Sequence, residues 1–258
     1  MSLELTIDGK RVEAEKGESL LEVARRAGAR IPSLCHHPLL RPYGACRLCL
    51  VEVEERGRVK TTTSCNYEVR EGISVRTDTP ELRRHRRMVL ELILSRAPDA
   101  PAVRELAKEY GIEKPRFSTA PPPAGRDRCI LCGLCARVCE EVVGACAITL
   151  FGRGDKRGLE VPFGELIAES CIGCGACAAV CPTGAIEMES IAAAVLRARP
   201  AVDRPCRYAL MGLMPGALCP NDYRCAACEV DQRFVEACDP YHPIFAARGL
   251  ISLEDGED

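Results

Sequence analysis

The stretch CILCGLCARVC, residues 129–139, decides the fold of its region, and CIGCGACAAVC, residues 171–181, repeats its spacing. Each run places four cysteines in the pattern C-x2-C-x2-C-x3-C, and Pro182 follows the second run. Three closely spaced thiolates followed by a fourth are typical of the ligands of a cubane iron–sulfur cluster. A zinc site would favour two C-x2-C pairs separated by a longer gap. The repeat therefore predicts two [4Fe-4S] clusters rather than two zinc ions.

The fourth cysteine of each run is expected to bind the cluster of the other run, as in proteins that hold two such clusters. The first cluster is assigned the ligands Cys129, Cys132, Cys135 and Cys181. The second cluster is assigned the ligands Cys171, Cys174, Cys177 and Cys139. Cys146 is left over in an apolar segment, which favours a small core side chain over a ligand.

A third group of cysteines lies near the N-terminus and is spaced C-x10-C-x2-C-x15-C. Its members are Cys35, Cys46, Cys49 and Cys65. Four cysteines in this order predict one [2Fe-2S] cluster, although the first gap is longer than in plant-type ferredoxins. Upstream, Asp8-Gly9 between two short runs predicts a hairpin, and Ser19 with Glu22 three residues later predicts the start of a helix.

Predicted elements and cysteine groups together indicate an α+β protein. The hairpin, a helix, the ligand loop and further strands are typical of a β-grasp domain, and helices are expected over 80–96 and 101–110. Residues 1–78 are expected to form a β-grasp [2Fe-2S] ferredoxin-type domain, followed by a helical connector over 79–113 and a proline-rich linker over 114–126. Residues 127–190 are expected to form a tandem [4Fe-4S] ferredoxin domain, and residues 191–258 an irregular cysteine-rich tail that begins with a helix.

The tail contains five more cysteines. Four of them, spaced C-x12-C-x5-C-x2-C, are Cys206, Cys219, Cys225 and Cys228, and Cys238 follows. A C-x2-C pair with two further cysteines is able to form a structural zinc site. The same thiolates also suit a further iron–sulfur cluster, and buried thiols without metal are the third alternative. A metal would help a tail of little periodicity to fold, and we expect the tail to dock onto a partner subunit.

Composition and charge exclude several classes of protein. The 258 residues include 4% aromatic residues and no Trp, and the formal net charge is −2. Basic residues occur without a nucleic-acid-binding motif, so no nucleic-acid partner is expected. No stretch approaches the ~18 apolar residues of a membrane span, and the N-terminal residues lack the features of a secretory signal. Free thiols suit a reducing compartment, so we expect a cytoplasmic protein.

Five stretches carry a family resemblance: IPSLCHHPLL, GACRLCLVEVE, TSCN, RRMVLELILSR and RELAKEYGI. They resemble the large iron–sulfur subunit of NADH–quinone oxidoreductase. They also resemble the diaphorase small subunit of NAD-linked nickel–iron hydrogenases and the iron–sulfur subunits of electron-bifurcating hydrogenases and NAD-dependent formate dehydrogenases. With the two four-cysteine runs, the resemblance covers residues 1–190 in order. Many relatives carry one His and three Cys for another cubane between the two helices, but residues 97–103, APDAPAV, hold neither. That cluster is therefore expected to be absent.

The resemblance implies a role in electron transfer. It implies an FMN-containing partner that reacts with NAD(P)H and a catalytic metal-centre partner, with a nickel–iron hydrogenase favoured over a formate dehydrogenase. Single electrons would pass between these partners, and an electron-bifurcating complex is compatible. The chain has no glycine-rich nucleotide loop after a strand, so we expect no active site of its own. The alternative is a free ferredoxin-like carrier or redox-sensing module, which would purify alone.

Overall fold

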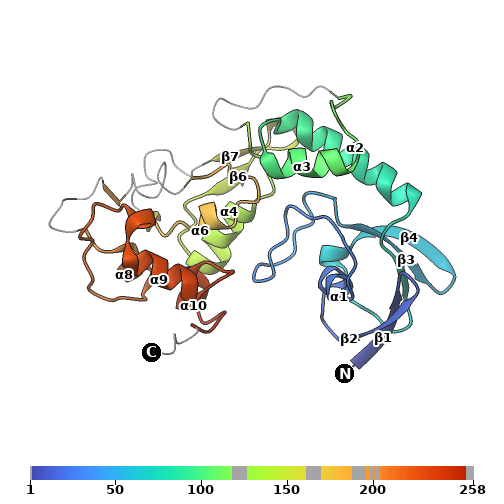
Figure 1. The fold of residues 1–258 in the computed structure, drawn as a ribbon, viewed down its shortest axis with the longest axis horizontal. Helices are drawn as coiled ribbons and strands as arrows, with labels where there is room; N and C mark the ends of the chain where they lie inside the picture. The colour runs from blue at the N-terminus through green and yellow to red at the C-terminus, as the bar shows by residue number, and fades with distance from the viewer. Residues whose placement is uncertain are drawn as a thin grey trace. The chain divides into compact units, whose positions relative to one another are not determined.

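The computed structural model describes residues 2–117, 127–160, 170–187, 196–197, 200 and 204–253. The predicted linker 114–126 and the helix expected at the start of the tail lie largely outside the described residues. The chain forms two compact units (Figure 1). The first contains Met1–His36 and Arg41–Cys132, and the second contains His37–Leu40 and Gly133–Asp258. This division is coarser than the five predicted segments, whose boundaries stay a prediction.

A mixed five-stranded sheet in the order β2-β1-β5-β3-β4 forms the first unit's framework (Figure 1). Strands β1 (Ser2–Ile7) and β2 (Lys10–Glu15) are antiparallel neighbours. The turn between them holds Asp8 at φ 48° and Gly9 at φ 82°, and two consecutive positive φ angles are what a two-residue hairpin turn requires. The predicted Asp-Gly hairpin is confirmed.

The remaining strands place the ligand loop beside the sheet. Strand β3 (Leu50–Glu55) pairs antiparallel with β4 (Arg58–Thr63) and with β5 (Ser74–Arg76). Strand β5 also pairs with β1, and these two strands are parallel. A short 3-10 helix, Ser64–Asn66, follows β4 directly. The beginning of β3 and the end of β4 are therefore adjacent, and the cysteines that flank them come from neighbouring strands.

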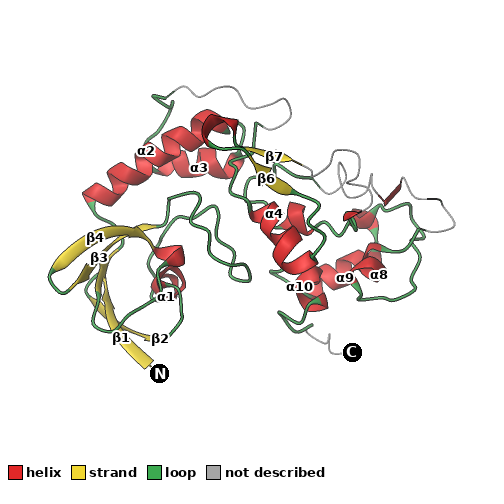
Figure 2. Ribbon diagram, turned by 180° about the vertical axis from the view of Figure 1, so that it is seen from behind, coloured by secondary structure: helices red, strands yellow, loops and turns green. Residues whose placement is uncertain are grey.

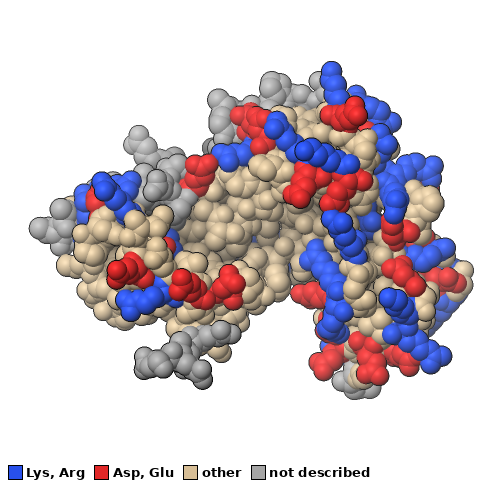
Figure 3. All heavy atoms as spheres, viewed as in Figure 1, with Lys and Arg blue, Asp and Glu red and all other residues tan. Residues whose placement is uncertain are grey.

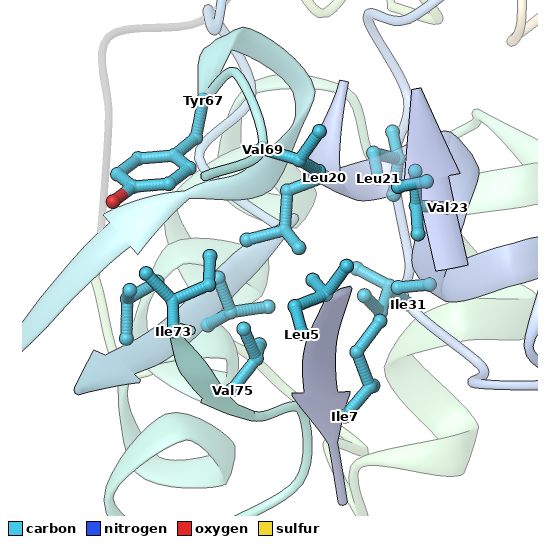
Figure 4. Packing of buried hydrophobic residues seen from close by; sticks show 14 of the residues in the cluster. Leu5, Ile7, Leu20, Leu21, Val23, Ile31, Tyr67, Val69, Ile73 and Val75 are labelled. Atoms are coloured by element: carbon cyan, nitrogen blue, oxygen red, sulfur yellow. The ribbon is translucent and has the colours of Figure 1, made fainter. Parts of the chain in front are cut away.

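Helix α1 (Leu20–Arg26) packs its apolar side against this sheet. The Ser19 hydroxyl accepts the Glu22 backbone N–H at 3.3 Å, which confirms the predicted helix start. Figure 4 shows Leu5 and Leu20 in one apolar cluster, with Val75 on the neighbouring strand. Burial of such side chains is the main stabilising term of a small domain.

The connector consists of helices α2 (Pro80–Arg96) and α3 (Pro101–Glu109), as predicted. Each begins with a proline, whose missing N–H is not needed at the first helical position. Only four residues, 97–100, separate the helices, and they contain neither Cys nor His. This short turn therefore contains none of the residue types that bind the additional cluster in the relatives.

Short helices and loops make up the second unit, with one two-stranded sheet among its described residues (Figure 2). Its α-helices are α4 (Leu134–Val138), α6 (Ala176–Ala179), α8 (Arg207–Met211), α9 (Glu229–Ala237) and α10 (Pro243–Ala247). A π-helix, Cys139–Val143, and two 3-10 helices, Gly154–Lys156 and Cys225–Ala227, complete the described helical segments. Its strands are β6 (Thr149–Phe151) and β7 (Gly158–Glu160). Across the part of the chain that the structure describes, no helix is long and apolar enough to span a membrane.

Candidate iron–sulfur centres

The four N-terminal cysteines converge in the first unit, and all four are buried. Cys35 lies in the loop after α1, Cys46 and Cys49 lie in the loop that enters β3, and Cys65 lies in the 3-10 helix after β4. The sulfur atoms of Cys35 and Cys46 are 3.3 Å apart. Cys49 and Cys65 form a second hydrogen-bonded pair. The structure thus brings together all four cysteines of the predicted binuclear site as two pairs.

Within each pair one thiol donates to the other, so their pKa values move in opposite directions. The hydrogen bond from Cys35 lowers the pKa of Cys46 to about 6. The hydrogen bond from Cys65 lowers the pKa of Cys49 to about 7. The pKa values of Cys35 and Cys65 rise, because each proton is held by its partner sulfur and because both groups are buried. Two thiols per pair fit a cluster with two irons, each bound by two thiolates.

Backbone N–H groups also point at these sulfurs. The Leu34 N–H donates to Cys46 Sγ at 3.4 Å, and the Cys46 N–H donates to Cys35 Sγ at 3.3 Å. Ser64 fixes the neighbouring loop, because its N–H and hydroxyl both donate to the Cys49 carbonyl, at 2.8 and 2.9 Å. Hydrogen bonds to sulfur stabilise negative charge on a bound cluster, so this environment fits an anionic iron–sulfur group.

Both histidines beside Cys35 have other partners. The His36 Nε2 atom lies 3.6 Å from the Glu22 carboxylate. His37 Nδ1 accepts the Leu39 N–H at 3.2 Å. The His37 ring also stacks on Phe245, with 4.9 Å between the ring centroids. These contacts agree with an all-cysteine ligand set.

In the second unit, Cys139 from the first run interacts electrostatically with the cysteines of the second run. Burial raises the pKa of Cys174 to about 11 and that of Cys177 to about 12. Negative charge on Cys171 and Cys139 contributes to both shifts. Such mutual repulsion requires the four thiols to be near one another. Cys139 is thus within electrostatic reach of the cysteines of the second run, and the assignment of these four thiols to one cluster stays a prediction.

Tight turns and backbone donors surround these four sulfurs. The Ala147 N–H donates to Cys139 Sγ at 3.2 Å, and the Gly173 N–H donates to Cys171 Sγ at 3.4 Å. Gly173 has φ 63°, and a Cβ there would lie 2.5 Å from Leu196 Cγ. Only glycine avoids both the left-handed strain and this clash. The turn that carries the second run therefore depends on this glycine.

The remaining cubane cysteines are divided between the two units. Cys129 and Cys132 belong to the first unit, whereas Cys135 and Cys181 belong to the second. Cys181 Sγ accepts the Ala185 N–H at 3.3 Å. Their assignment to one cluster stays a prediction.

Two family models match the chain. A 2Fe-2S iron–sulfur cluster binding domain matches residues 1–80, and a 4Fe-4S dicluster domain matches residues 128–185. The NADPH-Fe(3+) oxidoreductase subunit alpha of Geobacter sulfurreducens is 34% identical over 202 residues, which are 70% of this chain and 24% of that protein. The mitochondrial NADH-ubiquinone oxidoreductase 78 kDa subunit of Neurospora crassa is 31% identical over 222 residues, which are 77% of this chain and 29% of that protein.

The match to one solved structure extends over a larger share of the matched chain. The crystal structure of an NAD+-reducing [NiFe]-hydrogenase in the H2-reduced state matches with 30% identity and a TM-score of 0.56. The match covers 64% of this chain and 76% of that chain. The chain belongs to the family of iron–sulfur subunits that NADH–quinone oxidoreductases and NAD-reducing hydrogenases share. By contrast, it spans less than a third of the length of the two curated relatives, 24% and 29%. One 2Fe-2S domain and one 4Fe-4S dicluster domain make this family member an iron–sulfur electron-transfer protein.

The tail cysteines of this iron–sulfur subunit form a further group in the second unit. Burial raises the pKa of Cys225 to about 11, and charges on Cys219 and Cys228 contribute. Cys219 Sγ accepts the Tyr223 N–H at 3.2 Å, and Cys206 is half-buried. Among the described residues, which include the tail cysteines and the twelve predicted cluster ligands alike, no three His, Cys, Asp or Glu side chains are placed to hold a single metal ion. What the tail cysteines bind stays a prediction.

One expectation about an individual cysteine is wrong. Cys146 was expected in the core but is exposed. Gly144 has φ 77° and Cys146 has φ 48°. These left-handed residues end the π-helix and turn the chain. The apolar neighbours Val143 and Ala147 are therefore buried, while the Cys146 thiol faces solvent.

No sequence motif marks two arginines of this iron–sulfur subunit as buried. Arg86 on α2 and Arg207 on α8 are both buried. Arg207 Nη2 lies 2.9 Å from Asp231 Oδ1, and its charge acts to lower the pKa of Cys174. Arg86 does offer a sequence signal, because it follows Leu82 by four residues and precedes Leu90 by four. That spacing places it on the buried stripe of a helix.

Proposed function

We propose that this chain is an electron-transfer subunit between a flavoprotein subunit that reacts with NAD(P)H and a catalytic metal-centre subunit, with a nickel–iron hydrogenase as the favoured partner. The observation that carries the proposal is the similarity over 76% of a chain from an NAD+-reducing [NiFe]-hydrogenase. The same match has 30% sequence identity and a TM-score of 0.56, and it covers 64% of this chain.

Twelve cysteines would hold the cofactors in this proposal. Cys35, Cys46, Cys49 and Cys65 would bind the [2Fe-2S] cluster. Cys129, Cys132, Cys135 and Cys181 would bind one [4Fe-4S] cluster, and Cys171, Cys174, Cys177 and Cys139 would bind the other. Bound clusters of these kinds accept and release single electrons. The protein's own contribution is to bury the thiols, donate N–H groups to sulfur and exclude water.

Anaerobic purification of the chain from its native cells tests the proposal. We expect a flavoprotein and a nickel–iron hydrogenase chain to co-purify, with NAD(P)-linked hydrogen oxidation in the purified complex. The iron content should be about ten per subunit, because one binuclear and two cubane clusters would contribute two, four and four irons.

Each alternative gives a different result in the same preparation. Formate oxidation in place of hydrogen oxidation would assign a formate dehydrogenase partner. Simultaneous reduction of ferredoxin would indicate a bifurcating complex. A chain that purifies alone would be a free carrier, and iron near two per chain would refute the cubane assignment. About one zinc per chain would assign a zinc site to the tail.

A further inference from the structure

Arg86 is a buried cation next to the binuclear site. Its side chain is 1% exposed, and it is first among the large, fully buried side chains. The neighbouring arginines of α2 differ, because Arg83 and Arg84 are exposed and pair with Asp78 and Glu81. Figure 3 shows the same mixture of basic and acidic side chains over the face of α2 and α3. Arg86 is therefore set apart from the arginines around it.

The guanidinium of Arg86 holds the loop between two predicted cluster ligands. Its Nε donates to the Leu48 carbonyl at 3.1 Å, and Leu48 lies between Cys46 and Cys49. Its Nη2 donates to the carbonyls of Leu50, at 2.5 Å, and Thr77, at 2.8 Å. One side chain thus ties α2 to the ligand loop, to the first residue of β3 and to the end of β5.

Arg86 forms no ion pair among the described residues. All the hydrogen bonds that the structure gives it end on carbonyl oxygens. Arg83 pairs with the Asp78 carboxylate and lowers its pKa, and the charge of Arg86 contributes to this shift. An arginine keeps its proton under all ordinary conditions, and a buried charge is costly unless it is compensated. A cluster held by four thiolates is an anion that would supply this compensation.

We propose that Arg86 is a positioning residue of the binuclear site that fixes the Cys46–Cys49 loop and makes the bound cluster easier to reduce. This inference rests on the proposed [2Fe-2S] assignment. Reduction adds one negative charge to the cluster, and a fixed positive charge in a medium of low dielectric stabilises the added charge. Net charge and nearby hydrogen bonding are among the factors that set cluster potentials.

Redox titration of the purified complex, followed by electron paramagnetic resonance, tests this role. Arg86→Met removes the charge at similar length, and we expect it to shift the binuclear signal to a lower midpoint potential while the cubane signals keep theirs. Arg86→Lys keeps the charge but loses the planar fork. It should retain most of the wild-type potential with an altered line shape. Arg84→Met, an exposed neighbour on the same helix, is the matched control and should change neither.

Equal binuclear potentials and line shapes in wild type, Arg86→Met and Arg86→Lys would overturn the role of Arg86 alone. A wild-type complex without any binuclear signal would refute the site assignment and this inference together. If Arg86→Met fails to load iron, Arg86→Lys decides the matter. A wild-type potential and line shape in that variant would remove the positioning role.

Discussion

Cys139 and Cys146 occupy the same short stretch but have opposite environments. Cys139 is buried, and its sulfur accepts a backbone N–H, whereas Cys146 is exposed. Spacing alone predicts Cys139 to be a ligand and Cys146 not to be one, because only Cys139 fits the four-cysteine pattern. The sequence could not predict which thiols share a proton, since that depends on the loops that bring Cys35 and Cys46 to 3.3 Å.

A pair of serine variants tests the crossed ligation at this scale. Cys139→Ser should abolish or alter one cubane signal in electron paramagnetic resonance and lower the iron content, because a ligand of the second cluster is lost. The altered signal should be the one that Cys174→Ser also alters. Cys146→Ser is the control and should leave both cubane signals unchanged. The crossed arrangement is wrong if Cys139→Ser changes the same signal as Cys132→Ser.

Among the elements, α2 shows what local sequence can and cannot predict. Its start at Pro80 follows from proline at the first position and from Thr79, whose hydroxyl accepts the Leu82 N–H at 3.2 Å. The order of the strands could not be predicted in this way. The parallel pairing of β1 with β5 joins residues such as Ile7 and Val75, and such a contact depends on the packing of the whole unit.

The two faces of α2 should differ in their tolerance of truncation. Leu90 is 0% exposed, and Leu92 is 44% exposed on the same helix. We expect Leu90→Ala to lower the free energy of unfolding by about 2–5 kcal/mol, because it leaves a cavity. Leu92→Ala is the matched control and should change it by no more than ~0.5 kcal/mol. Anaerobic urea unfolding, followed by visible circular dichroism of the binuclear site, measures both variants, and similar losses would contradict the described packing.

On the scale of the whole molecule, the two units have different sources of stability. The first unit has a five-stranded sheet and a 17-residue helix α2. In the second unit, α4 has five residues and α6 has four. Helices this short are not stable by themselves, so ligation of metal is expected to supply folding free energy there. The cysteine spacings predicted the 2Fe-2S and 4Fe-4S domains, but not that residues 37–40 and 133–258 form one unit, because the contacts that join them are distant along the chain.

Removal of iron should therefore affect the units unequally. In hydrogen exchange followed by mass spectrometry, the iron-free chain should lose protection mainly over residues 133–160 and 170–187, while α1 and β1 keep much of theirs. The iron-loaded chain under the same conditions is the reference. Equal loss of protection in both units would show that the sheet depends on iron as strongly as the short helices do.

Arg248 connects the end of the described chain to the segment that carries Cys139. Its Nε donates to the Val142 carbonyl at 3.0 Å, and its Nη2 donates to the Val143 carbonyl at 3.3 Å. All eighteen cysteines precede Arg248 in the sequence. During translation, these two carbonyls can therefore accept the Arg248 hydrogen bonds only after every cysteine has been synthesised. A chain truncated just before Arg248 would therefore keep all eighteen thiols but lack the two hydrogen bonds that hold the segment after Cys139.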